Sequence, residues 1–237
     1  MRSGRLLGTG LDGDAVQLAA AGLVRLTAED WLGGAAGAPA WLSHVRAAAF
    51  ADTWIAFGET AAPGLRVPAG AVVRSVASLA AELVLQARGY DDLATLEWLG
   101  RESAEARDRA RRDDVSHPVE PAALALVWHG VQAAGADGGA ADGEADADGE
   151  AAADGRESHD RRITERAEAY VRERHRRQDT LAILLACARI AATALQELSG
   201  GDHAGAARHL DAHATRHMSH TAPVPLWVPG RPDKAAA

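Results

Sequence analysis

DTLAILLACARIAATALQELSGGDHAGAARHLDAHA, residues 179–214, is the segment with the clearest helical pattern in this chain. Leucine, isoleucine and alanine fill the segment from Leu181 to Leu198 at helical spacing, which predicts a buried helix. Ser199-Gly200-Gly201 ends that helix, and Asp202 caps a last helix that runs to about His220. The stretch therefore predicts a helical hairpin.

The composition extends this prediction to the whole chain of 237 residues. Hydrophobic residues make up 47% of it, but we count 56 alanines among them, so the core is thin. Alanine has the highest helix propensity, while β-branched and aromatic residues are scarce, so helix is the regular structure that the composition favours. The predicted fold class is all-α, and a mainly β protein is excluded.

In the first 134 residues, the signals that start and end helices follow one another at short intervals, which predicts an antiparallel helical bundle. Thr27 with Asp30 three residues later resembles a capping box after a short first helix. Amphipathic helices are predicted at about 14–25, from Pro39 to Gly58, from Pro68 to Gly89, from Asp91 or Asp92 onward, and from Pro121 onward.

An acidic segment separates two parts of the chain. Residues 135–155 read GADGGAADGEADADGEAAADG, which offers nothing larger than alanine for burial, so a disordered acidic linker is predicted. Residues 156–220 form the second helical part, which begins with one long helix or two stacked helices meeting near Gln178. Residues 221–237 contain four prolines and are predicted to be an extended tail.

The last predicted helix carries a ladder of histidines. His209, His213, His217 and His220 fall within about 80° of one another at 100° per residue, so they share one helix face. Imidazoles four residues apart can chelate a divalent transition metal, with Asp202 or His175 as candidate further ligands. A solvated histidine-rich face and a pH-sensing cluster are the two alternatives.

The nucleic-acid alternative rests on residues 26–46, which loosely resemble a helix-turn-helix of the repressor type. The spacing from the turn to the recognition helix differs by one residue from that of the helix-turn-helix motif. The second helix, AWLSHVRAAAFADTW, has one arginine and large apolar residues, which indicates a core element. A DNA-binding regulator is therefore the third hypothesis, and we expect no nucleic-acid partner.

No motif indicates catalysis. The chain has no glycine-rich phosphate loop, no GxSxG and no plausible Cys–His pair, and its single cysteine, Cys187, suits an inert core thiol. The leading hypothesis is a cytoplasmic, non-enzymatic interaction or regulatory protein. It predicts a protein partner or a homo-oligomer, with the helix from Ile163 to Leu198 as the contact surface. No membrane contact is expected, and no cofactor apart from the metal of the second hypothesis.

Overall fold

The computed structural model describes residues 10–32, 40–60, 69–113, 119–138, 161–173 and 177–217. These residues form helices and the turns between them, and this described part contains no strand. The prediction of an all-α protein is confirmed.

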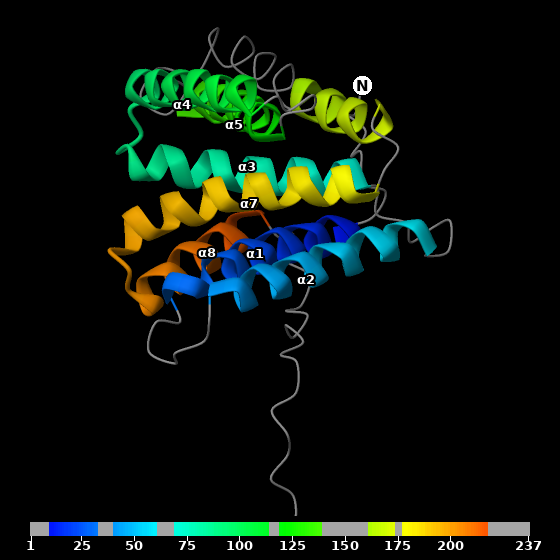
Figure 1. Cartoon of the computed structure of the whole chain (residues 1–237). Helices are drawn as coiled ribbons and strands as arrows, with labels where there is room; N and C mark the ends of the chain where they lie inside the picture. Colours follow the sequence, from blue (N-terminus) through cyan, green and yellow to red (C-terminus); the bar gives the residue numbers. More distant parts are fainter. Residues whose placement is uncertain are drawn as a thin grey trace, which may run out of the picture.

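Figure 1 shows the helices stacked in three layers. The upper layer holds α4 and α5, the middle layer α3 and α7, and the lower layer α1, α2 and α8. Residues 161–173 form a further helix, in which Ile163 and Ala167 are fully buried. The labelled helices are α1 (Gly10–Leu32), α2 (Ala40–Thr60), α3 (Ala69–Ala87), α4 (Asp92–Arg112), α5 (Val119–Gly138), α7 (Arg177–Ser199) and α8 (His203–His217).

Helix α7 lies at the centre of the molecule. It packs most extensively against α3 and also contacts α1, α2, α5 and α8. Ile183, Leu184 and Leu195 on α7 belong to the same buried cluster as Leu23 of α1 and Leu79 of α3. The N-terminal and C-terminal helices therefore share one hydrophobic core, although an acidic segment separates them in sequence.

Two helix caps and the glycine turn lie where the sequence predicts them. Asp91 caps α4, because its Oδ1 accepts the backbone N–H of Ala94, and Asp202 caps α8 in the same way by accepting from Gly205 at 2.7 Å. Gly200 and Gly201 both have positive φ angles, a conformation that glycine adopts at little cost. The predicted break between α7 and α8 is confirmed.

Two predicted boundaries are wrong. The Thr27–Asp30 capping box does not start a helix: the Thr27 hydroxyl donates to the carbonyl of Leu23 one turn back, and α1 continues to Leu32. Helix α5 starts at Val119, two residues before Pro121, and runs to Gly138. It therefore includes the first four residues of the predicted linker, whose other residues lie outside the described ranges.

Among the described residues, α3 and α7 are long and apolar enough to cross a membrane by length and composition. Both are largely packed inside the bundle: 67% of the apolar window in α3 and 50% of that in α7 are buried. A core helix has the same length and composition, so these two helices are weak evidence for a membrane protein.

Candidate functional site

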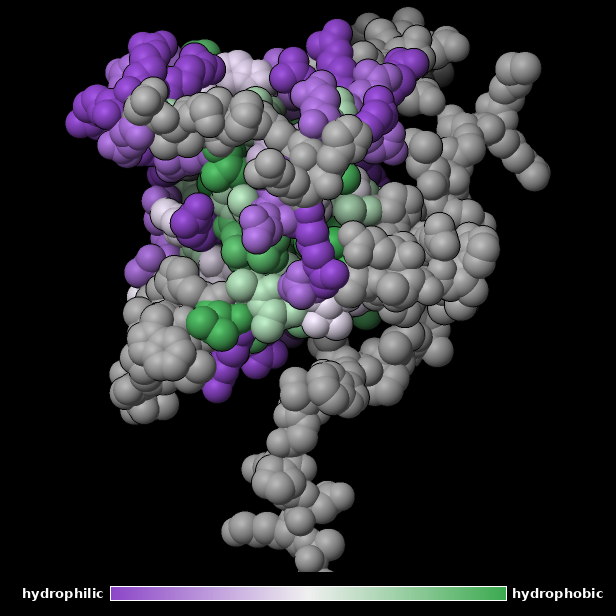
Figure 2. Space-filling view, turned by 45° about the vertical axis from the view of Figure 1, so that its right-hand side comes forward, coloured by the Kyte–Doolittle hydropathy of each residue, from purple (hydrophilic) through white to green (hydrophobic). Residues whose placement is uncertain are grey.

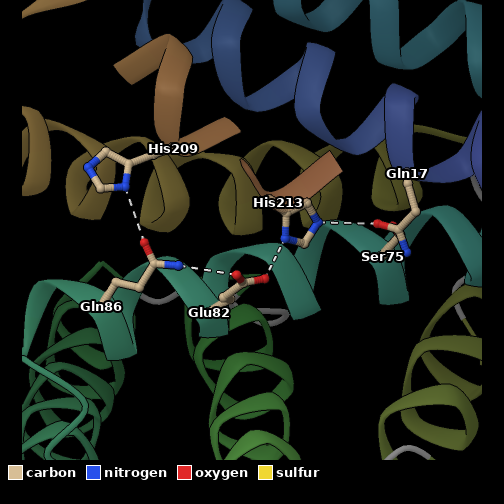
Figure 3. Close-up of polar contacts among 6 residues, drawn as sticks. All are labelled: Gln17, Ser75, Glu82, Gln86, His209 and His213. Atoms are coloured by element: carbon tan, nitrogen blue, oxygen red, sulfur yellow. Dashed lines mark hydrogen bonds and ion pairs between the residues drawn. The ribbon is translucent and has the colours of Figure 1, made fainter. Parts of the chain in front are cut away.

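A network of polar side chains lies between α1, α3 and α8. Glu82 and Gln86 of α3 contact His213 and His209 of α8, as Figure 3 shows. On the other side of the His213 ring, Gln17 of α1 joins the network and accepts a hydrogen bond of 2.9 Å from the hydroxyl of Ser75. The network links three helices through the interior of a bundle that is otherwise packed with alanine, valine and leucine.

His213 is the centre of this network. Its ring is 2% exposed, and its Nδ1 forms a short contact with a carboxylate oxygen of Glu82. Its Nε2 lies 3.3 Å from the side-chain oxygen of Gln17. Because both ring nitrogens face oxygen atoms, this arrangement suits the doubly protonated imidazolium, which donates on both sides. When the ring is protonated, His213 and Glu82 form a largely buried ion pair.

His209 is linked to the carboxylate of Glu82 through the side chain of Gln86. Nδ1 of His209 lies 3.2 Å from the side-chain oxygen of Gln86, and the amide nitrogen of Gln86 donates to Glu82 at 3.1 Å. Glu82 thus receives hydrogen bonds from the His213 ring and from the Gln86 amide through its two different oxygens. This arrangement holds the carboxylate in one orientation.

The buried apolar face of α8 is small in the part of the helix whose burial the structure describes. Among residues 203–213 of α8, whose burial the structure describes, the buried hydrophobic residues are Ala206 and Leu210, and Leu210 is the larger of the two. His213 continues this stripe one turn further and is also buried. The polar contact to Glu82 therefore occupies a position where a core leucine would normally pack.

Nucleophilic chemistry finds no support in this geometry. Ser75, His213 and Glu82 have the residue types of a hydrolase triad, but the Ser75 hydroxyl bonds to Gln17 and not to the histidine. Ser75 is also buried, with 1% exposure, so a substrate cannot reach it. Burial raises the pKa of the Cys187 thiol to about 12, which keeps it protonated and unreactive near neutral pH.

The predicted metal ligands lie as follows. His209 and His213 both point from α8 toward α3, where an amide and a carboxylate occupy their Nδ1 atoms. His217 ends α8, while its side chain, His220 and His175 lie outside the described residues. Within the described part of the chain, no three histidine, cysteine, aspartate or glutamate side chains gather closely enough to hold a metal ion.

Sequence reasoning missed Gln17, Ser75, Glu82 and Gln86. A signal for the three α3 residues is present, because Ser75, Glu82 and Gln86 follow one another at intervals of seven and four. This spacing places them on one helix face together with buried Leu79. Polar residues on an otherwise apolar stripe indicate a buried polar partner.

A second feature is an apolar pocket over the N-terminal half of α7. Its volume is about 260 Å³, and four helices line it through Thr27, Ala47, Val119, Ala182, Leu185 and Arg189. Ala182, Leu185 and Arg189 repeat at intervals of three and four along α7, so they form one stripe. Figure 2 shows apolar residues gathered in the middle of one face of the molecule, below hydrophilic residues at the top of the view.

Arg189 is the charged group of this pocket. In the described ranges, no carboxylate forms an ion pair with it, and its side chain is exposed. Among the described lining residues, the one other polar side chain is that of Thr27, whose hydroxyl already donates its proton to the carbonyl of Leu23. Within the part of the chain that the structure describes, the pocket is thus an apolar hollow with an unpaired guanidinium at its side.

Helix α2, the predicted recognition helix of the DNA-binding hypothesis, contributes Ala47, Ala51 and Ile55 to the core. It packs against α1 and α7. Comparison of the chain with protein-family models, curated proteins and solved structures gives no match.

Proposed function

We propose that this chain is a non-enzymatic helical interaction protein that accepts a side chain of a protein partner in the pocket over α7. The pocket itself carries this proposal. Its volume of about 260 Å³ lies below the range of about 300–1,000 Å³ that is usual for sites of drug-sized ligands. One or two side chains of a partner fill such a volume.

The lining of the pocket defines the chemistry of its occupant. The walls are made of alanine, valine and leucine side chains, which favour a large apolar or aromatic group. Arg189 stands beside them without an ion pair in the part of the chain that the structure describes, so it favours a carboxylate next to that group. A partner segment with an aromatic or aliphatic side chain beside an acidic residue meets both requirements.

The experiment uses 3-phenylpropionate as a minimal probe, because it joins an aromatic ring to a carboxylate. The methyl resonances of Leu185 and Val119 are followed by NMR while the probe is added to the full chain. We expect saturable shifts of these methyls, a loss of the shifts in Ala182→Phe, which fills the pocket, and several-fold weaker binding in Arg189→Gln.

Two controls make the result specific. The neutral analogue 3-phenylpropanol has the same ring and is expected to bind more weakly, with an affinity that does not depend on salt. Val45→Ser removes an exposed apolar side chain of α2 outside the pocket lining and is expected to bind like the parent protein. Absence of shifts at millimolar probe in the parent protein contradicts the proposal.

A further inference from the structure

The turn between α3 and α4 exposes large apolar side chains. Among the described residues, the exposed large hydrophobics are Val45, Tyr90 and Leu93; Tyr90 lies in this turn, and Leu93 in the first turn of α4 directly after it. Tyr90 is 66% and Leu93 69% exposed. Asp91 and Asp92 lie between them in sequence, so the turn presents an aromatic ring, a leucine and two carboxylates together.

The backbone holds Tyr90 in this exposed position. Its φ of 61° is in the left-handed region, which a residue with a Cβ rarely adopts, and the preceding Gly89 has a positive φ as well. The Tyr90 N–H donates to the carbonyl of Leu85 at 2.9 Å and the Asp91 N–H to that of Arg88 at 3.3 Å. The ring is thus carried by a hydrogen-bonded turn, which reduces the entropy lost on binding.

This turn has the chemistry that the pocket over α7 requires. The Tyr90 ring matches the apolar walls, and Asp92 matches the cation of Arg189. The Thr27 hydroxyl uses its proton on Leu23, so its oxygen retains a lone pair that can accept the hydrogen of a tyrosine phenol. Asp91 is committed to the N-cap of α4, which leaves Asp92 for the ion pair.

The turn of one molecule cannot fill the pocket of the same molecule. Arg88, two residues before Tyr90, pairs with Glu197 near the end of α7. The pocket is lined by Ala182, Leu185 and Arg189 of α7, and the nearest of these, Arg189, lies eight residues before Glu197, about 12 Å along the helix axis at 1.5 Å per residue. The turn and the pocket therefore meet only between two copies of the chain.

We propose that a second copy of this chain is the partner: its Tyr90 enters the pocket over α7 and its Asp92 pairs with Arg189. This inference rests on the proposed function, since it names the occupant of that same pocket. The contact joins two different surfaces, so it is heterologous and builds a ring or a chain of molecules. One pocket buries far less than the roughly 1,200 Å² of a stable interface, so the self-association is weak and depends on concentration.

The test measures the mass of the full chain by analytical ultracentrifugation over a concentration series up to about 1 mM, a range that suits weak association. We expect the mean mass to rise with concentration and the rise to shrink at high salt. The double variant Tyr90→Ser, Leu93→Ser is expected to weaken association at least tenfold. The matched control Val45→Ser, which also removes an exposed apolar side chain, is expected to associate like the parent protein.

A charge exchange separates the contact from an effect on folding. Arg189→Glu alone and Asp92→Arg alone each bring like charges together and are expected to stay monomeric. In a mixture of the two variants, contacts between unlike molecules join opposite charges in both directions, so association is expected to return as alternating oligomers. Monomers in that mixture, or a parent protein that stays monomeric at the highest concentration, overturn the inference.

The two proposals fail in different ways. Binding of 3-phenylpropionate by a parent protein that does not self-associate overturns the second copy as partner and leaves the pocket as an acceptor for another protein. Absence of both probe binding and self-association overturns both proposals. If the Tyr90→Ser, Leu93→Ser variant self-associates as strongly as the parent protein, another surface forms the contact. That result overturns this inference alone.

Discussion

At the scale of single residues, the feature to explain is a histidine–carboxylate pair inside an alanine-rich bundle. Alanine faces are nearly uniform, so helices packed through them distinguish poorly between one register and the next. The pair of His213 and Glu82 is satisfied in one register alone, because both groups lose their partner if α8 slides by a turn. We infer that the pair fixes the position of α8 more than it adds stability.

This inference predicts an asymmetry between single and double variants. Glu82→Ala or His213→Ala removes the contact between the two side chains and leaves the other one largely buried, and each is expected to lower the free energy of unfolding by about 3 kcal/mol. The double variant Glu82→Leu, His213→Leu is expected to recover most of this loss, because both polar groups are gone and Leu210 gains an apolar neighbour.

Urea denaturation at pH 7 measures these changes, and His203→Ala serves as the control. His203 is exposed at the start of the same helix, so its removal is expected to change stability by less than about 0.5 kcal/mol. Single variants at Glu82 and His213 that cost no more than the control contradict the inference.

The sequence reveals part of this site. Helical spacing correctly places His209 and His213 on one face of the last helix, because that depends only on 100° per residue. Spacing does not say whether that face meets solvent, a metal or the core. The answer depends on Glu82 and Gln86, which are more than 120 residues away in sequence and become neighbours only through tertiary packing.

At the scale of helices, local signals define most ends. Asp91 and Asp202 cap helices as predicted because a cap needs only one side chain and the next turn. Thr27 fails as a cap because the same hydroxyl can bond backward to Leu23, and burial of Ala28 inside the bundle favours a continuous α1. Tertiary packing thus decides between two local hydrogen bonds of similar strength.

Two helical glycines give a prediction about this packing. A Cβ added at Gly130 of α5 would lie 2.6 Å from the Cβ of Ala81 on α3, which is closer than two carbon atoms pack. Gly130→Ala is therefore expected to lower the free energy of unfolding by about 1–3 kcal/mol, the usual cost of overpacking.

Gly100→Ala is the matched control on α4. A Cβ there meets nothing nearer than a ring atom of Trp128 at 3.9 Å, and Gly100 is exposed. This substitution is expected to raise stability by about 0.5–1 kcal/mol, because alanine is the better helix former. Thermal melts of both variants check the opposite signs, and equal effects would show that α3 and α5 do not approach as closely as described.

At the scale of the whole molecule, chain order and spatial order differ. The sequence divides naturally at its acidic segment, and each half reads as a set of amphipathic helices. The helix at the centre of the structure, α7, nevertheless comes near the end of the chain and packs between helices that precede the acidic segment. Periodicity marks α7 as buried, but it carries no information about which helices cover it.

This order predicts that residues 1–138 do not fold alone. Without α7, the parts of α1 and α3 that pack on it would be exposed to water, and both helices carry buried side chains of the size of Leu23 and Val76. Each such side chain contributes about 1.5–3 kcal/mol when buried, and the total stability of a domain is only about 5–15 kcal/mol. Loss of a few of these contacts therefore exceeds the stability of the fold. We expect the fragment to be helical but to melt without a cooperative transition, as followed by circular dichroism and calorimetry.

Complementation provides the decisive half of this experiment. A separate polypeptide of residues 156–217 supplies α7 and α8, and its addition is expected to restore a cooperative melt to the fragment in a one-to-one complex. The same polypeptide with Leu184→Glu and Leu195→Glu is the control, because both leucines are fully buried on α7 and a carboxylate at these positions cannot be solvated. A cooperative melt of residues 1–138 alone would show that the first five helices form a complete core. Helix α7 would then pack onto a bundle that is already stable, and it would not be required for folding.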